Sequence, residues 1–328
     1  MFKPADFPRY PTATRQYNTS TPPIQHQYPA NTTPVPRQYN TSTLPTTNLY
    51  PMNHAHLSHR IQEKQSFLCV GLDTDPRRLP VGMQANERDV LRFNRDIIEA
   101  TQAYAVAYKI NIAFYEAMGP QGWAILQETL QYIPEGIFTI ADAKRGDIGN
   151  TAEQYARAFF EVMNFDAITL NAYMGHDAVS PFLAYRDKWA IVLALTTNPG
   201  AADFQYRTDE QGIPLYLSMA QAAAEWGNPD QMMLVAGANR TAELSELRTA
   251  IPQHFFLIPG VGAQGGSLTD VYNAAAASTG PCMLVNASRS IIFASSGQDY
   301  AMRAGDEASR LQSEMSSLLN SGTAPYIG

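Results

Sequence analysis

The stretch that decides the fold is residues 138–152, which read Phe-Thr-Ile-Ala-Asp-Ala-Lys-Arg-Gly-Asp-Ile-Gly-Asn-Thr-Ala. An apolar, strand-like run over residues 136–141 leads directly into charged residues that include Asp142, Lys144 and Asp147. Side chains two residues apart on an extended backbone point the same way, so Asp142 and Lys144 are expected on one face. Two carboxylates and an ammonium group are therefore expected where a strand ends.

The chain must leave this strand near Asp147, and Asn150 or Thr151 is predicted to cap a helix that begins near Ala152. In a parallel α/β fold, chemistry is done at the carboxyl ends of the strands. The charges of residues 142–147 alone are equally compatible with a surface ion-pair cluster, so the rest of the chain must decide.

The rest of the domain alternates between apolar runs and amphipathic segments. Strands are predicted over residues 66–72, 105–111, 136–141, 167–171, 189–195, 232–237, 255–259 and 281–286. Helices are predicted over residues 86–101, from Pro120 through Leu130, and over 152–163, 178–185, 216–226, 241–250, 268–277 and about 299–320. Eight strands alternating with helices predict an α/β fold of the (β/α)₈ TIM-barrel type, which needs about 250 residues.

The first 51 residues have a different composition, rich in Thr, Pro, Gln, Asn and Tyr, and are predicted to be a disordered extension. The heptapeptide Arg-Gln-Tyr-Asn-Thr-Ser-Thr occurs in them twice, at 15–21 and 37–43. An ordinary helical opening follows Met52, which suggests that Met52 is the true start and that residues 52–328 form the catalytic domain. Detection of a peptide from residues 1–51 in the natively expressed protein would contradict this hypothesis.

Composition excludes several classes of function. The net charge of −7 argues against nucleic-acid binding, and the sequence has no apolar run of about 18 residues that could span a membrane. Cys69 and Cys282 lie in apolar runs and are interpreted as buried, reduced thiols of a cytoplasmic protein. No metal-ligand spacing is evident, and the histidines at 54, 56 and 59 are more typical of a solvated segment before the first helix.

Polar residues recur where the predicted strands end. They are Asp73, Lys109, Asp142, Lys144, Thr197, Gln264 and Arg289. Lys109 lies within its strand, and a buried lysine is costly unless it is paired, so Asp142 on the next strand is its expected partner.

The seventh and eighth strands end in features suited to phosphate. The glycine-rich segment 260–266 can direct backbone N–H groups at an anion, and Arg289 offers a forked donor. Taken alone, the glycines could form a plain tight turn, and Arg289 could form a surface ion pair. Their occurrence at adjacent strand ends favours a phosphate site, a frequent use of these loops in TIM barrels.

Opposite this phosphate site, the mouth is expected to hold Lys109, Asp142, Lys144 and Asp147 as a preorganised charged network. The carboxylates would keep both lysines protonated, so either lysine could act as a general acid. Two aspartates could also hold Mg²⁺ in a related design, an alternative that the residues leave open.

Residues 142–152 resemble the signature of the orotidine 5′-phosphate decarboxylase family, in its longer bacterial subclass (type 2). Further segments in family order are 66–76, 108–111, 196–200, 259–266 and 288–289. The resemblance runs from about Met52 to the C-terminus. It implies conversion of orotidine 5′-phosphate to uridine 5′-phosphate and CO₂, the last step of de novo pyrimidine synthesis, without cofactor or metal.

The resemblance also implies roles for single residues. Lys144 would protonate C6 of the pyrimidine, Asp142 would lie near the departing carboxylate, and Lys109 and Asp73 would hold the ribose hydroxyls. Asp147, with Thr151 nearby, would reach into the partner's site in a homodimer.

Three further residues complete this implied site. Thr197, at a position that is more often Ser in the family, would contact the pyrimidine, and Gln264 and Arg289 would bind the phosphate. The loops at 198–213 and 260–267 are expected to act as lids.

Two other hypotheses fit parts of the pattern. A Mg²⁺-dependent sugar-phosphate decarboxylase or aldolase on the same barrel also uses Asp-x-Lys-x-x-Asp. A catalytically inactive nucleotide-binding barrel is the non-enzymatic alternative, but retained buried charges without a use would carry a cost.

Overall fold

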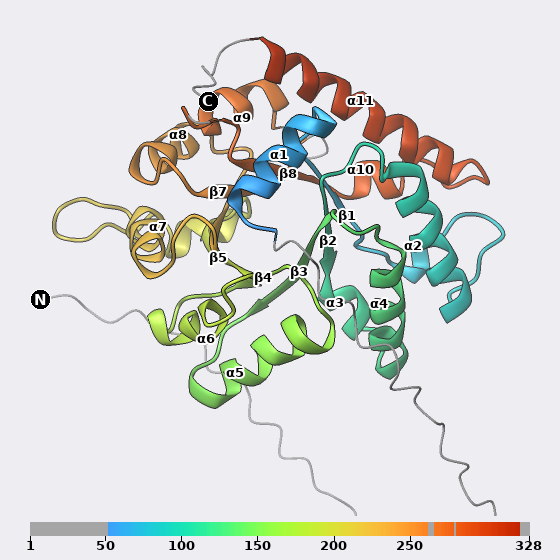
Figure 1. The fold of residues 1–328 in the computed structure, drawn as a ribbon, viewed down its shortest axis with the longest axis horizontal. Helices are drawn as coiled ribbons and strands as arrows, with labels where there is room; N and C mark the ends of the chain where they lie inside the picture. Colours follow the sequence, from blue (N-terminus) through green and yellow to red (C-terminus); the bar gives the residue numbers. More distant parts are fainter. Residues whose placement is uncertain (1–51, 262–265, 279, 322–328) are drawn as a thin grey trace, which may run out of the picture. The chain divides into compact units, whose positions relative to one another are not determined.

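Eight parallel strands close into a barrel in chain order, with β1 paired to both β2 and β8 (Figure 1). The computed structural model describes residues 52–261, 266–278 and 280–321. The strands are β1 (Leu68–Gly71), β2 (Ala107–Asn111), β3 (Phe138–Arg145), β4 (Ala167–Leu170), β5 (Trp189–Leu195), β6 (Met232–Ala236), β7 (Phe255–Pro259) and β8 (Met283–Ala287). The predicted (β/α)₈ barrel is confirmed.

Helices surround the barrel and alternate with its strands (Figure 1). The first part of the chain contributes α1 (His54–Lys64), α2 (Glu87–Thr101), α3 (Ile112–Glu116), α4 (Pro120–Tyr132), α5 (Gly149–Arg157) and α6 (Ser180–Leu183). The second part contributes α7 (Leu215–Trp226), α8 (Thr241–Ala250), α9 (Leu268–Ala275), α10 (Arg289–Ile292) and α11 (Tyr300–Asn320). None of the described helices is long and apolar enough to cross a membrane.

The sequence prediction was wrong about where β3 ends and how α5 begins. β3 runs to Arg145, four residues beyond the predicted end, and therefore contains both Asp142 and Lys144. α5 begins at Gly149 without a side-chain cap, so neither Asn150 nor Thr151 caps it. Gly149 has φ +56°, a left-handed conformation that glycine adopts without steric cost, and this lets the chain turn into the helix earlier than predicted.

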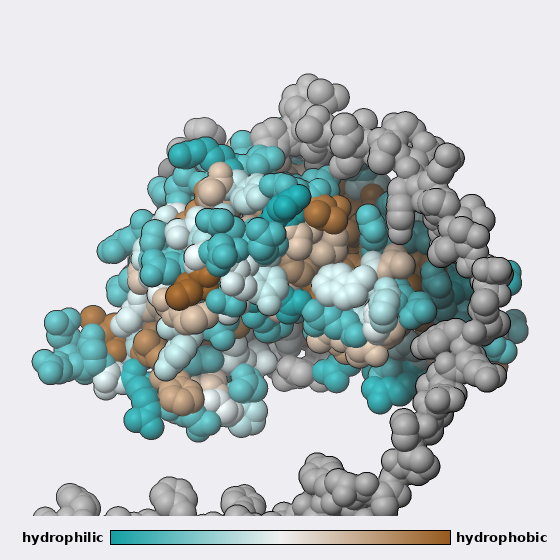
Figure 2. Space-filling view, turned by 90° about the horizontal axis from the view of Figure 1, so that it is seen from below, coloured by the Kyte–Doolittle hydropathy of each residue, from teal (hydrophilic) through white to brown (hydrophobic). Residues whose placement is uncertain are grey.

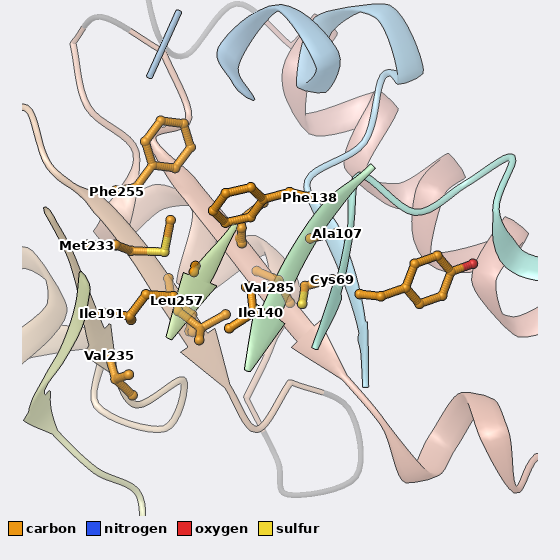
Figure 3. Close-up of a cluster of buried hydrophobic side chains, with 14 of the residues drawn as sticks. Cys69, Ala107, Phe138, Ile140, Ile191, Met233, Val235, Phe255, Leu257 and Val285 are labelled. Atoms are coloured by element: carbon orange, nitrogen blue, oxygen red, sulfur yellow. The ribbon is translucent and has the colours of Figure 1, made fainter. Parts of the chain in front are cut away.

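The barrel interior is filled by apolar side chains from the strands. Figure 3 shows this core, with Cys69, Ala107, Phe138, Ile140, Ile191, Met233, Val235, Phe255, Leu257 and Val285 labelled. The Trp189 ring packs edge-on against Phe138 and Phe255, with centroids 5.8 and 5.9 Å away. Both cysteines are buried, as predicted, and neither forms a disulfide within the described residues. Burial raises the pKa of the Cys69 thiol to about 12.

The strand register carries charged residues to one end of this apolar core. Ala107 pairs with Phe138, Lys109 with Ile140 and Asn111 with Asp142. Because side chains alternate with a period of two, Lys109 lies on the same face of β2 as Ala107. Asp142 likewise shares the face of Phe138 and Ile140, so both charges point inward at the carboxyl end of the barrel.

Met52 closes the opposite, amino-terminal region of the barrel. It is buried, and its carbonyl accepts a hydrogen bond of 2.5 Å from the indole N–H of Trp189. The predicted disorder of residues 1–51 falls outside the described residues. One face of the molecule, shown in Figure 2, is mainly hydrophilic with a few hydrophobic residues scattered over it.

Candidate active site

A cavity of about 360 Å³ opens at the carboxyl ends of the strands. The structure brings most of the predicted site residues together along its wall. They are Asp73, Lys109, Asp142, Lys144, Thr197 and Arg289. Apolar side chains from β5, β6 and β7, namely Leu193, Val235 and Leu257, form part of the wall, so the charges act beside low-polarity surface.

Lys109 and Asp142 form the centre of the charged network, as the sequence predicts. Lys109 Nζ donates to Asp142 Oδ2 at 2.7 Å, and both side chains are buried. Asp73 Oδ1 lies 3.5 Å from the same ammonium group. Lys109 is therefore held between two carboxylates.

Lys144 reaches Asp142 by an unexpected backbone path. Three residues of β3, 142–144, face a single residue of β4, Thr169, so the register shifts here. Lys144 itself has φ +48°, a left-handed conformation that costs a non-glycine residue about 1–2 kcal/mol. The extended alternation predicted through Lys144 is thus wrong, yet its ammonium group donates to Asp142 Oδ1 at 2.5 Å.

Thr169 stabilises this bulge and is a site residue that the sequence interpretation missed. Its hydroxyl accepts a hydrogen bond from the Lys144 backbone N–H at 2.9 Å and donates to Asp142 Oδ1 at 3.1 Å. One buried hydroxyl therefore connects the strained backbone of Lys144 to the carboxylate that its side chain contacts. A polar residue inside the apolar run of β4 was the available signal.

Opposite charges keep the buried groups ionised. Burial opposes the charged form of Lys109, but Asp73 and Asp142 outweigh it and raise the pKa of the lysine. Burial likewise favours a neutral Asp142, but Lys109 and Lys144 lower the pKa of Asp142 to about 2. The site thus presents fixed ionic charges at neutral pH before any substrate arrives.

The fourth charge of the network within one chain is Asp73, not Asp147. Asp147 Oδ1 accepts a hydrogen bond from the backbone N–H of Ile148 at 2.8 Å, and in the described part of the chain it forms no salt bridge with either lysine. Thr151, on the first turn of α5, is exposed. The chain turns away after Gly146, and these two side chains leave the cavity.

The expected phosphate end of the cavity is formed by Gly260, Val261, Ser288 and Arg289. Arg289 begins α10, is exposed, and forms no salt bridge within the described residues. Gln264 lies outside the described residues. The arrangement leaves the guanidinium of Arg289 available to an anion.

The segment after β5 is folded against the cavity wall. The side chain of Gln205 accepts from Thr196 N–H at 2.9 Å and donates to Thr196 Oγ1 at 2.8 Å. The segment returns through a bridge between Thr208 and Pro214. Gln205, also missed from sequence, thus holds the turn that carries Thr197.

The family model named Orotidine 5′-phosphate decarboxylase / HUMPS family matches residues 66–304. The chain belongs to this family. Its sequence is 46% identical over 272 residues to orotidine 5′-phosphate decarboxylase of Phocaeicola vulgatus, covering 82% of this chain and 99% of that protein. Orotidine 5′-phosphate decarboxylase of Flavobacterium johnsoniae is 46% identical over 273 residues, which again cover 82% of this chain and 99% of that protein.

Solved structures of the decarboxylase family agree with this assignment. The structure of Leishmania donovani OMP decarboxylase is similar to this one with a TM-score of 0.67 and 36% sequence identity, covering 79% of this chain and 97% of that chain. Both the sequence and the barrel therefore place this chain with the decarboxylases.

Asp142→Asn tests the electrostatic account of the site. The folded-state pKa of Asp142 is about 2, below its ordinary value of 3.8, so ionisation contributes stability above pH 4 that is lost as the pH falls towards 2. The variant is expected to lose about 3 kcal/mol of unfolding free energy at pH 7 because Lys109 loses a buried partner. The unfolding free energy of the wild type is expected to fall by about 2 kcal/mol between pH 4 and pH 2 as Asp142 is protonated, and the variant should not show this fall.

Urea unfolding at a series of pH values measures both effects. Asp75→Asn is the matched control, because Asp75 also has a lowered pKa beside an arginine, but that arginine, Arg77, is exposed to solvent, where ion pairs contribute little. An unchanged pH dependence in Asp142→Asn would contradict the account.

Proposed function

We propose that this chain decarboxylates orotidine 5′-phosphate to uridine 5′-phosphate and CO₂, with Lys144 as the proton donor to C6. The observation that carries the proposal is the contact of 2.5 Å between Lys144 Nζ and Asp142 Oδ1, beside the buried Lys109. When the C6–carboxylate bond breaks, its electron pair stays on C6. An adjacent ammonium group stabilises that charge and then supplies the proton that forms the C–H bond.

Asp142 is proposed to act against the substrate carboxylate. Because the lysines lower its pKa to about 2, Asp142 is negative at neutral pH. A bound carboxylate beside it is disfavoured, and this repulsion decreases as CO₂ leaves as a neutral molecule. The interaction thus differs between ground state and transition state, which is the requirement for catalysis.

The remaining cavity residues are proposed to bind the parts of the nucleotide that do not react. Asp73 and Lys109 would hold the ribose hydroxyls, Thr197 would contact the pyrimidine, and Arg289 with Gln264 would bind the phosphate. Binding of the phosphate group can stabilise the transition state of decarboxylation, although the phosphate is far from C6. The segment 198–213 and the loop at 260–267 would exclude water as lids.

Asp147 and Thr151 are proposed to complete the site of a second subunit in a homodimer. Supporting this, Asp147 takes no part in the ion pairs of its own chain's network. Large apolar side chains are exposed in the segments that follow β3 and the neighbouring strand β4, with Ile148 50% and Tyr173 86% exposed. The enzyme is proposed to work in the cytoplasm, in keeping with its two buried cysteines, which form no disulfide within the described residues.

A Mg²⁺-dependent sugar-phosphate decarboxylase or aldolase on the same barrel is the alternative that the Asp-x-Lys-x-x-Asp motif raises. Against it, the oxygens of Asp142 already accept hydrogen bonds from Lys109, Lys144 and Thr169. A carboxylate committed to two ammonium groups is poorly placed to coordinate a further cation. The chemistry of this donor set therefore favours the metal-independent reaction.

Purified protein is expected to consume orotidine 5′-phosphate at an undiminished rate after treatment with a chelator. The reason is that the residues above supply both charge stabilisation and the proton. The loss of substrate absorbance measures turnover. Turnover that disappears with chelator and returns with Mg²⁺ would favour the alternative.

Lys144→Ala is expected to reduce kcat by at least about 10³-fold, because both the proton donor and its stabilising charge are removed. Binding of uridine 5′-phosphate, measured by calorimetry, should persist. Arg145→Ala is a neighbouring control. Arg145 pairs with Glu116 and does not line the cavity, so this variant should retain activity. Full activity in Lys144→Ala would refute the assigned role.

Mixing inactive Asp147→Ala protein with inactive Lys144→Ala protein is expected to restore up to about a quarter of wild-type activity. Random exchange makes half of the dimers mixed, and one of the two shared sites in each mixed dimer would be intact. Subunit exchange is verified with differently tagged chains. Exchange without recovery would count against a shared site.

A further inference from the structure

Four buried polar side chains form a network beneath the loop that follows β1. They are Thr74 in the loop, Asn94 on α2, Tyr115 on α3 and Thr129 on α4, and all four are fully buried. The Asn94 amide lies at the centre. Its oxygen accepts from Thr74 Oγ1 at 2.6 Å, and its nitrogen donates to Tyr115 OH at 3.0 Å and to Thr129 Oγ1 at 2.8 Å.

This network holds the chain on both sides of Asp73. Tyr115 OH donates to the carbonyl of Leu72 at 3.2 Å, and Thr74 is bonded to Asn94. The N–H of Leu72 also donates to the carbonyl of Lys109 at 2.8 Å. The two neighbours of Asp73 are therefore fixed to three helices and to β2.

The carboxylate of Asp73, in contrast, is only weakly held by its own contacts. Its Oδ1 is buried and makes no hydrogen bond within the described part of the chain, and Lys109 Nζ lies 3.5 Å from it. Asp73 lines the cavity, and the exposed part of its carboxylate side chain, 17% of its surface, is open to a ligand hydroxyl. Its direction must therefore come mainly from the backbone that carries it.

We propose that Thr74, Asn94, Tyr115 and Thr129 are positioning residues that aim Asp73 at the ribose hydroxyls of the bound nucleotide. The inference rests on the proposed function, because it takes a nucleotide as the ligand. The network does not touch the reacting atoms. It sets how strongly the site prefers a ribose with hydroxyls over one without them.

A purely structural role is the competing explanation, and the chain offers a matched control for it. Tyr108 on β2 is also fully buried, and its hydroxyl is bonded to Thr101 Oγ1 at 2.7 Å and to the carbonyl of Ile98 at 3.1 Å. Tyr108→Phe and Tyr115→Phe thus each remove one buried hydroxyl. Only the second hydroxyl is bonded to a residue next to Asp73.

The experiment measures Kd for uridine 5′-phosphate and for 2′,3′-dideoxyuridine 5′-phosphate by calorimetry, in the wild type and in both variants. Tyr115→Phe is expected to reduce the wild-type preference for the hydroxylated nucleotide by roughly three- to tenfold, the effect of one hydrogen bond. KM for orotidine 5′-phosphate should rise by a similar factor, with kcat within about twofold of wild type. Tyr108→Phe should leave the preference unchanged.

A second pair of variants covers the case in which Tyr115→Phe fails to fold. Thr74→Val removes the hydroxyl bonded to Asn94 and should reduce the preference, whereas Thr74→Ser keeps a hydroxyl and should restore it. An unchanged preference in the folded Tyr115→Phe or Thr74→Val variant, or an equal loss in Tyr108→Phe, would overturn this inference alone. Absence of wild-type turnover and uridine 5′-phosphate binding would overturn the proposed function as well.

Discussion

The pairing of Lys109 with Asp142 across β2 and β3 is the constraint on which the site depends. An ammonium group on the inward face of a barrel strand is tolerated only with a carboxylate beside it. The register places Asn111 opposite Asp142, so Lys109 lies one inward position below and its long side chain can reach the carboxylate. A one-residue slip would turn Asp142 to the outer face and leave Lys109 without its hydrogen-bonded carboxylate.

The same pair explains why Lys144 tolerates a strained backbone. Asp142 has two oxygens, and Lys109 takes Oδ2, so a second cation must approach Oδ1 from another direction. On a regular strand, the side chain of Lys144 would point in the same direction as that of Asp142, parallel to it. The bulge opposite Thr169 redirects it, and Thr169 satisfies the backbone N–H that the bulge frees. Local strain is thus retained where it orients a functional group.

The charged end of the barrel is supported from outside as well as from within. Apolar packing around Trp189 and Phe255 fills the lower barrel, while polar networks lie under the loops at the mouth. Gln205 holds the turn that carries Thr197, and the Asn94 network holds the loop that carries Asp73. Loops that carry functional side chains are thereby fixed by side-chain hydrogen bonds rather than by their own secondary structure.

The local sequence was sufficient for the barrel and for most cavity residues, because alternation of apolar runs and helices, and polar residues at strand ends, are patterns within short segments. It could not show that Asp73 replaces Asp147 in the single-chain network, that β3 bulges at Lys144, or that Thr169 joins the site. Each of these depends on which residues of neighbouring strands face each other. Register between strands is a property of the closed barrel, so only the tertiary structure decided which charges of this chain meet.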